Sequence, residues 1–335
     1  MLLDIPIARQ IIGFVYVSFI PGILILGILR LNLKSRIDVV MFSVGLSVAF
    51  LMFVGLIVNE LYPLAGVSKP LSVLPLSVTI GTVLLAMTCV IYKTGDLACT
   101  VPIPSIGQVV RTLLLIGAPL LAIFGALLTN SLILLLMVIT VVVLVVATVF
   151  YRKLVPFEMH VIFILVIAAS LLFQREFISK YLLGHDVFGE FYVFRLANAN
   201  SSWNAGLSLG EPALLNYDAM LSVTVLPVVY SKLLGMQGEW VFKVVYLLLY
   251  SLVPVSLYQM YHQRFGRPTA FLSAFYFMLF PRFYTLSSRR QMIAELFLVL
   301  MIFLIIDRGI ERRKRQILFT IFGAALVVSH YSLSY

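Results

Sequence analysis

The chain has 335 residues, of which 62% are hydrophobic and 11% are charged, and its mean hydropathy is +1.08. A soluble protein of this length cannot hide that much apolar surface, so the composition excludes a soluble globular protein. The formal net charge of +10 does not indicate a nucleic-acid partner, because the basic residues lie between apolar runs, where they orient a chain in a membrane.

Apolar runs of about 20 residues recur along the chain, and each can cross roughly 30 Å of hydrocarbon. Backbone groups within lipid must bond inside their own segment, so these runs should be helices. We therefore predict an all-α, polytopic integral membrane protein with about 10 transmembrane helices. The predicted spans are 10–30, 39–59, 73–92, 111–128, 131–150, 157–173, 240–261, 268–286, 291–307 and 317–335.

The first five spans form a predicted N-terminal module, residues 1–155, and residues 156–335 form a second membrane module. The acidic residues Glu60 and Asp96 of the first module lie at span ends, where charge costs little, so we expect a packing or lipid-facing role. Its segments Pro21-Gly22 and Lys69-Pro-Leu-Ser72 resemble an uncharacterised module of archaeal membrane proteins.

The sidedness of the chain follows from its basic loops, which the positive-inside rule places in the cytoplasm. By this rule the loop 174–239, whose hydrophilic part is 174–216, lies outside a multi-pass protein of the cell membrane. We interpret the apolar segment 219–236 as an outer interfacial or re-entrant helix, because an ordinary span there would put the basic cluster 308–315 outside. The ordinary span stays as the alternative. The basic residues used are Lys34, Arg36, Lys93, Arg111, Arg152, Lys153, Arg264 and Arg267.

The outer loop carries the residues best suited to chemistry. Asp186 and Glu190 are four residues apart, so on a helix they share one face, and Gly184 suits a sharp turn before that helix. A carboxylate at a water–lipid boundary can act as general base toward an acceptor hydroxyl. With His185, the two carboxylates are also candidate ligands of a divalent cation, Mg²⁺ or Mn²⁺. The alternative is that these side chains are simply solvated.

Further candidates lie near the outer ends of two later spans. Arg289 and Arg290 precede the ninth span, and arginine suits a phosphate because its planar group makes two bonds at once. Glu295, one turn further in, should face the bundle interior, and its two alternative roles are a structural ion pair with one of these arginines or the orientation of one of them toward a phosphate. Contact with ordinary anionic headgroups is the alternative for the arginines. His330 and Tyr331 lie on the predicted side of Asp186, although a structural hydrogen bond would also explain this histidine.

The second module carries a family resemblance. Gly184-His185-Asp186 with Glu190 follows a span, and the runs 290–297 and 329–332 come after an outer amphipathic segment. This order resembles the front part of the GT-C superfamily of membrane glycosyltransferases, and within it large archaeal multi-pass membrane proteins. The tandem Asp-Glu of some GT-C members is replaced here by Asp186 and Glu190. Because the last apolar run reaches Tyr335 without a polar tail, we expect a module truncated at its C-terminus.

The resemblance implies a sugar transfer, as in protein glycosylation, from a polyprenyl- or dolichyl-phosphate-linked donor to an extracytoplasmic protein or glycan acceptor. The rival hypothesis is a non-enzymatic scaffold or carrier in surface-glycan assembly. Membrane lipid is the other expected partner. The resemblance implies Asp186 as the catalytic residue, and we add Glu190 as its helper, with His185, Arg289, Arg290, Glu295, His330 and Tyr331 as substrate-binding residues.

Overall fold

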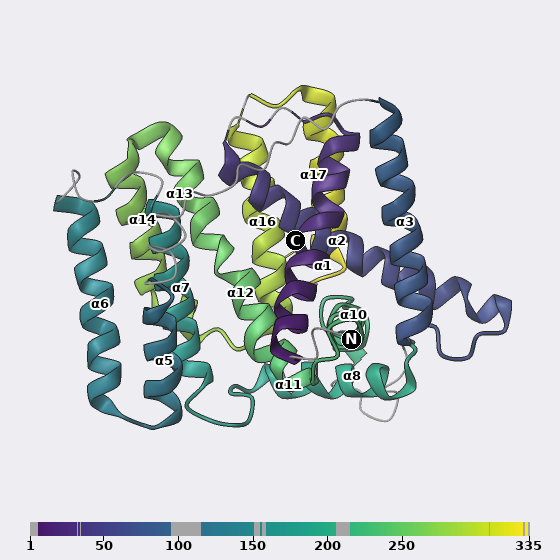
Figure 1. The fold of residues 1–335 in the computed structure, drawn as a ribbon, viewed down its shortest axis with the longest axis horizontal. Coiled ribbons are helices and arrows are strands. Elements are labelled where there is room, and N and C mark those ends of the chain that lie inside the picture. Colours follow the sequence, from purple (N-terminus) through teal and green to yellow (C-terminus); the bar gives the residue numbers. More distant parts are fainter. Residues whose placement is uncertain are drawn as a thin grey trace. The chain divides into compact units, whose positions relative to one another are not determined.

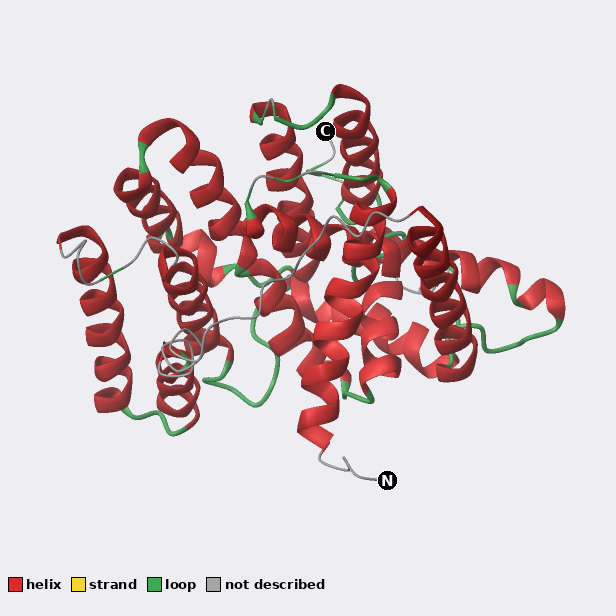
Figure 2. Cartoon of the chain, turned by 45° about the horizontal axis from the view of Figure 1, so that its top comes forward, coloured by secondary structure: helices red, strands yellow, loops and turns green. Residues whose placement is uncertain are grey.

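The computed structural model describes residues 6–31, 33, 35–94, 115–150, 155, 159–205, 215–307, 309–330 and 332–333. Every regular element in these ranges is a helix, as Figure 2 shows. The predicted all-α fold is therefore confirmed for the described part of the chain.

Six of these helices are long and apolar enough to cross a membrane, which supports a membrane-embedded protein. The predicted total of about 10 spans is not confirmed. Of the other predicted spans, 111–128 contains the described helix Gly117–Leu127, which has only 11 residues, and the helix over most of 291–307 carries three charged residues, Arg289, Arg290 and Glu295. Residues 268–286 form two helices, because Pro281 begins a new one. The six helices are Ile7–Ile28, Arg36–Ala65, Val73–Lys93, Ser131–Phe150, Met159–Glu176 and Gly238–Phe265.

The chain folds into two compact units, and each unit collects segments that are distant in sequence. The first comprises Met1–Thr100, Gly184–Val245 and Ser288–Tyr335, and the second comprises Val101–Leu183 and Tyr246–Ser287. The division of the sequence at residue 155 stays a prediction. The helices of the first unit are α1 (Pro6–Ile28), α2 (Arg36–Leu61), η1 (Pro63–Ala65), α3 (Val73–Thr94), α8 (Asp186–Asn200), α9 (Leu215–Asp218), α10 (Val225–Leu234), α11 (Gly238–Trp240), η3 (Val241–Val245), α16 (Arg289–Ile306) and α17 (Arg312–Val327).

Helix α2 is the centre of the first unit and packs against α1, α3, α10, α16 and α17 (Figure 1). Small residues allow the close approach of α1, because Gly22 lies against the backbone of Ser43 and its N–H donates to the Ser47 hydroxyl at 2.8 Å. On another side, the ring of Phe42 packs against those of Phe303 and Phe322. Residues from both ends of the chain thus share one core.

The C-terminal end of α8 is fastened to α2 and to the segment before α3. The Asn59 side chain accepts a hydrogen bond from the Trp203 N–H at 2.6 Å and donates one to the Trp203 carbonyl at 2.8 Å. The backbone N–H of Leu71 donates to the Ser201 carbonyl at 2.8 Å. These bonds explain why α8, which runs crosswise to α3 in Figure 1, belongs to the same unit as the first 100 residues.

The segment predicted as an interfacial or re-entrant helix contains α10, a helix of ten residues. At 1.5 Å per residue it is about 15 Å long, half of what a membrane crossing needs. It is mostly buried, and its Tyr230 hydroxyl shares a 2.9 Å hydrogen bond with Ser18 of α1. A helix of this length does not cross a membrane by itself, and the interfacial or re-entrant location stays a prediction.

The second unit is arranged around α7, which packs against α5, α6, α12, α13, α14 and α15. His160, near the start of α7, is buried, and its Nδ1 lies 3.3 Å from the Tyr258 hydroxyl. Its ring also packs edge-on against Phe271, so this histidine has a structural role. The helices of this unit are α5 (Gly117–Leu127), α6 (Ser131–Phe150), α7 (Met159–Glu176), α12 (Tyr246–Tyr250), α13 (Leu252–Phe265), α14 (Arg267–Leu279) and α15 (Pro281–Thr285).

Candidate functional site

The predicted Asp186–Glu190 pair lies on the first turns of α8, within the first unit. Gly184 has φ of 121°, a conformation that glycine adopts easily, and it turns the chain into the helix, which begins at Asp186. An aspartate in the first turn is favoured by the positive end of the helix dipole. Both carboxylates reach the guanidinium of Arg290, so the prediction that they share one helix face is confirmed.

Glu190 is fully buried and joins α8 to the start of α16. Its Oε1 accepts a hydrogen bond from the Ser288 hydroxyl and its Oε2 accepts one from the Arg289 N–H, both at 2.7 Å. Burial raises the pKa of this carboxyl, while Ser288, the Arg289 N–H and Arg290 act in the opposite direction. Ser288 occupies the N-cap of α16 without capping it, so Glu190 supplies the acceptor that the helix start requires.

Arg290 connects three elements. Its Nη2 lies 3.5 Å from Oδ2 of Asp186, and its Nε lies 3.4 Å from Oε1 of Glu190. Its guanidinium carbon lies 4.4 Å from the ring centroid of Tyr217, a cation–π contact. Burial raises the pKa of the Tyr217 phenol, and the ring packs on Val193, Met220 and Val223. Arg290 is 8% exposed, so its side chain is held inside this cluster.

The two consecutive arginines have different environments. The Arg289 side chain is fully buried, and its Nε donates to the Phe242 carbonyl at 2.9 Å. Phe242 belongs to η3, a π-helical turn, and such turns alter the usual carbonyl pattern of a helix. Arg289 therefore anchors the start of α16, and Arg290 is the member of the pair that reaches Asp186.

Asp186 is the exposed carboxylate of the site, with 43% of its side chain accessible. Its Oδ2 faces Arg290, and its Oδ1 lies 3.9 Å from Nδ1 of His185, whose side chain is fully exposed. One carboxylate oxygen thus faces a cation, and the side chain as a whole stays accessible to solvent. This arrangement allows Asp186 to accept a proton from an incoming hydroxyl.

His330 follows the end of α17 and is largely buried. Its Nδ1 accepts hydrogen bonds from the N–H groups of Ser332 at 3.1 Å and Leu333 at 3.3 Å. Burial and the positive charge of Arg290 lower the pKa of this imidazole, and Asp186 acts in the opposite direction. The Nδ1 of His330 thus has a structural role, and the charges of Arg290 and Asp186 act on its imidazole.

Two predicted residues remain, Glu295 and Tyr331. Glu295 accepts a hydrogen bond from Nε2 of Gln291 at 2.7 Å on the same helix, α16. Tyr331 lies outside the described residues. The sequence did not single out Ser288 or the contact of Tyr217 with Arg290, because the contacts to α8 come from segments far apart in the chain.

The carboxylate pair does not fit a divalent metal. Both oxygens of Glu190 already face donors, and the guanidinium of Arg290 lies against both carboxylates, where a metal would otherwise be held. In the described part of the chain, no group of three or more His, Cys, Asp or Glu side chains is placed to hold a metal ion. The cation of this cluster is therefore an arginine.

Two aromatic side chains of α8 pack this helix onto η3. The ring of Phe242 lies 5.3 Å from that of Phe191 and 5.5 Å from that of Phe194, which packs α8 onto η3. Phe188 and Tyr192 are exposed instead. Only these two of the four aromatic residues of α8 are therefore available to contact the membrane surface.

No protein-family model, curated protein or solved structure matches the chain. The fold and the cluster together describe an all-helical, membrane-embedded protein with one exposed aspartate that is oriented by a buried arginine.

Proposed function

We propose that the protein is a GT-C-type membrane glycosyltransferase, which moves a sugar from a polyprenyl- or dolichyl-phosphate-linked donor to an extracytoplasmic protein or glycan acceptor. The observation that carries this proposal is the pair Asp186–Arg290, in which an accessible carboxylate is oriented at 3.5 Å by an almost fully buried cation. The apolar helices of the fold suit a donor that resides in lipid.

Asp186 is the general base in the proposed reaction. The acceptor hydroxyl loses its proton to Oδ1 of Asp186 while its oxygen forms the new bond to the anomeric carbon of the sugar. The bond between that carbon and the phosphate oxygen breaks, and the lipid phosphate leaves with the electron pair. Holding donor, acceptor and base together supplies much of the rate gain in such a transfer.

The buried residues of the cluster position Asp186. Glu190 is fully buried and does not contact substrate, so its role is to hold Arg290 and the start of α16. Arg290 fixes the orientation of the Asp186 carboxylate and contributes positive charge that favours an anionic donor. Arg289 has the supporting role described above.

The positions of the charged residues favour a transferase over a carrier. A carrier is expected to place ionisable groups near the membrane midplane, on broken helices. By the predicted spans, Asp186 lies in the outer loop and Arg290 just before the ninth span, so the charges of this cluster belong to the outer boundary and not to the midplane. A scaffold in surface-glycan assembly remains the second candidate, and the experiment below separates it from the enzyme.

The test is sugar transfer in membrane vesicles with radiolabelled dolichyl- and polyprenyl-phosphate hexoses as donors. Asp186→Asn keeps the size of the side chain and removes the base, so we expect at least a 100-fold loss of transfer, as is typical of general-base catalysis. Glu239→Gln is the matched control, because Glu239 is an exposed carboxylate of the same unit. Wild-type transfer by Asp186→Asn, or no consumption of any donor by the unmodified protein, would refute the proposal and favour the scaffold.

A further inference from the structure

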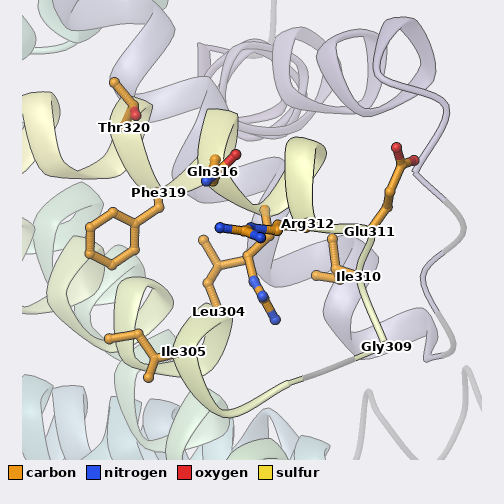
Figure 3. Close-up of a pocket in the computed structure, with 10 residues that line it drawn as sticks. Leu304, Ile305, Gly309, Ile310, Glu311, Arg312, Gln316, Phe319 and Thr320 are labelled. Carbon is orange, nitrogen blue, oxygen red and sulfur yellow. The ribbon is translucent and has the colours of Figure 1, made fainter.

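A second feature of the first unit lies at the opposite end of α16 from Arg290. There the end of α16 and the start of α17 line an open pocket of about 740 Å³ (Figure 3). None of its lining residues belongs to the Asp186–Arg290 cluster. The lining consists of Leu304, Ile305, Gly309, Ile310, Glu311, Arg312, Arg315, Gln316, Phe319 and Thr320.

The walls of this pocket are divided into an apolar and a basic part. Ile305 is 65% exposed and Phe319 is 38% exposed, so large apolar side chains remain uncovered next to it. Arg312 and Arg315 lie one turn apart on α17 and line the other part. Figure 3 draws Arg312 and Leu304 among the lining side chains, so positive charge and an apolar wall belong to the same pocket.

The positive charge of the pocket is not neutralised by its acidic neighbour. Glu311 pairs with Lys314 at 3.2 Å, and Figure 3 shows its carboxylate directed away from the guanidinium of Arg312. Arg315 donates a hydrogen bond to the backbone carbonyl of Asp307 at 3.4 Å. Because a backbone carbonyl carries no net charge, this contact does not neutralise the arginine. Among the described residues, no acidic side chain forms an ion pair with Arg312 or Arg315.

The pocket lies where the apolar end of α16 meets the basic start of α17, as is typical of a membrane surface. Helix α16 is uncharged from Leu296 to Ile306, and α17 begins with four consecutive basic residues, 312–315. A helix pair that changes from apolar to basic at this point has its ends at the level of the lipid headgroups. A phospholipid there can lay an acyl chain along Ile305 and Phe319 and bring its phosphate to the arginines.

We propose that this pocket is a binding site for an anionic phospholipid, whose phosphate headgroup contacts Arg312 and Arg315 while its acyl chain covers the apolar wall. The two arginines offer planar donors that suit a phosphate, and the exposed apolar residues suit a lipid rather than a free ion. This site is independent of the proposed glycosyltransferase function, because it shares no residue with it.

The first experiment measures lipid binding to the full chain in nanodiscs of phosphatidylcholine with increasing phosphatidylglycerol, by lipid-adduct mass spectrometry after release. Replacing both arginines, Arg312→Gln with Arg315→Gln, should weaken phosphatidylglycerol retention by about 30-fold, because each cation near the surface attracts an anionic lipid. The matched control is Arg313→Gln, which removes an exposed arginine of the same turn that does not line the pocket. Equal losses in the control and the double variant would overturn the proposal.

A second measurement keeps both arginines and so does not depend on the folding of the double variant. Thr320 is an exposed lining residue, so Thr320→Trp places a fluorophore at the pocket. Its emission, after subtraction of the two native tryptophans, should be quenched several-fold more by brominated phosphatidylglycerol than by brominated phosphatidylcholine at equal mole fraction. Equal quenching by both lipids would show that no anionic lipid is selected and would refute the site.

Discussion

Replacing Glu190 by alanine should destabilise the first unit strongly. The carboxylate accepts hydrogen bonds from the Ser288 hydroxyl and the Arg289 N–H, and each bond to a charged group is worth about 1.5–3 kcal/mol. Its removal also leaves the buried Arg290 with Asp186 as its remaining carboxylate in this cluster. Alanine does not carry the desolvation cost of a buried carboxylate, which offsets part of this loss. We therefore expect a net decrease in the free energy of unfolding of about 3–5 kcal/mol.

The assay is reversible unfolding in mixed micelles, with the free energy of unfolding compared between Glu190→Ala and Glu239→Ala. Glu239 is exposed, and its replacement should change the free energy by no more than about 0.5 kcal/mol. Hydrogen exchange of the Arg289 amide gives a local readout, because that N–H loses its acceptor only in the Glu190 variant. A Glu190→Ala protein as stable as the control, with unchanged exchange at Arg289, would refute the capping role of this carboxylate.

Two further predictions concern packing and pH. Gly22→Ala should cost about 1–3 kcal/mol of stability, since its Cβ would overlap the backbone carbonyl of Ser43, whereas Gly81→Ala, where the added Cβ meets no atom within 4 Å, should be neutral or stabilising in the same unfolding assay. His330 has a lowered pKa in the folded protein, so its contribution to stability is present above pH 6.5 and is lost as the pH falls through the lowered pKa. In the His330→Gln variant the free energy of unfolding should therefore change less with pH below pH 6.5 than in the unmodified protein. The same pH dependence in both proteins would contradict this.

Local sequence features predicted the start of the site well. The turn at Gly184, the helix beginning at Asp186 and the shared face of Asp186 and Glu190 follow from conformational preference and helical spacing, which act within a few residues. The same local signals could not show that Glu190 is fully buried while Asp186 is exposed. That difference arises because α16 covers one of the two carboxylates and leaves the other at its edge.

Hydropathy alone does not predict which apolar segments form membrane-spanning helices. Residues 219–236 are apolar enough to suggest a span, but the helix that forms there has only ten residues and is buried among α1, α2, α3 and α8. Hydropathy measures how readily a segment leaves water and does not distinguish lipid from a protein interior. Residues 219–236 are not among the ten predicted spans, whereas residues 268–286 are predicted as one span although Pro281 divides them into two helices.

The sequence by itself determined the all-helical, membrane-embedded character of the chain and the carboxylate pair on α8, because composition and helical spacing act through local preference and transfer from water. Only the tertiary structure decided which carboxylate is buried, that Arg289 is an anchor and Arg290 a partner of Asp186, and that residues 1–100 support α8. These features depend on contacts between residues that are distant in sequence, from 47 positions for Arg289 with Phe242 to 98 for Glu190 with Ser288 and 144 for Asn59 with Trp203. The physical reason is that burial and hydrogen-bond partners belong to the packed arrangement of helices, which no single segment encodes.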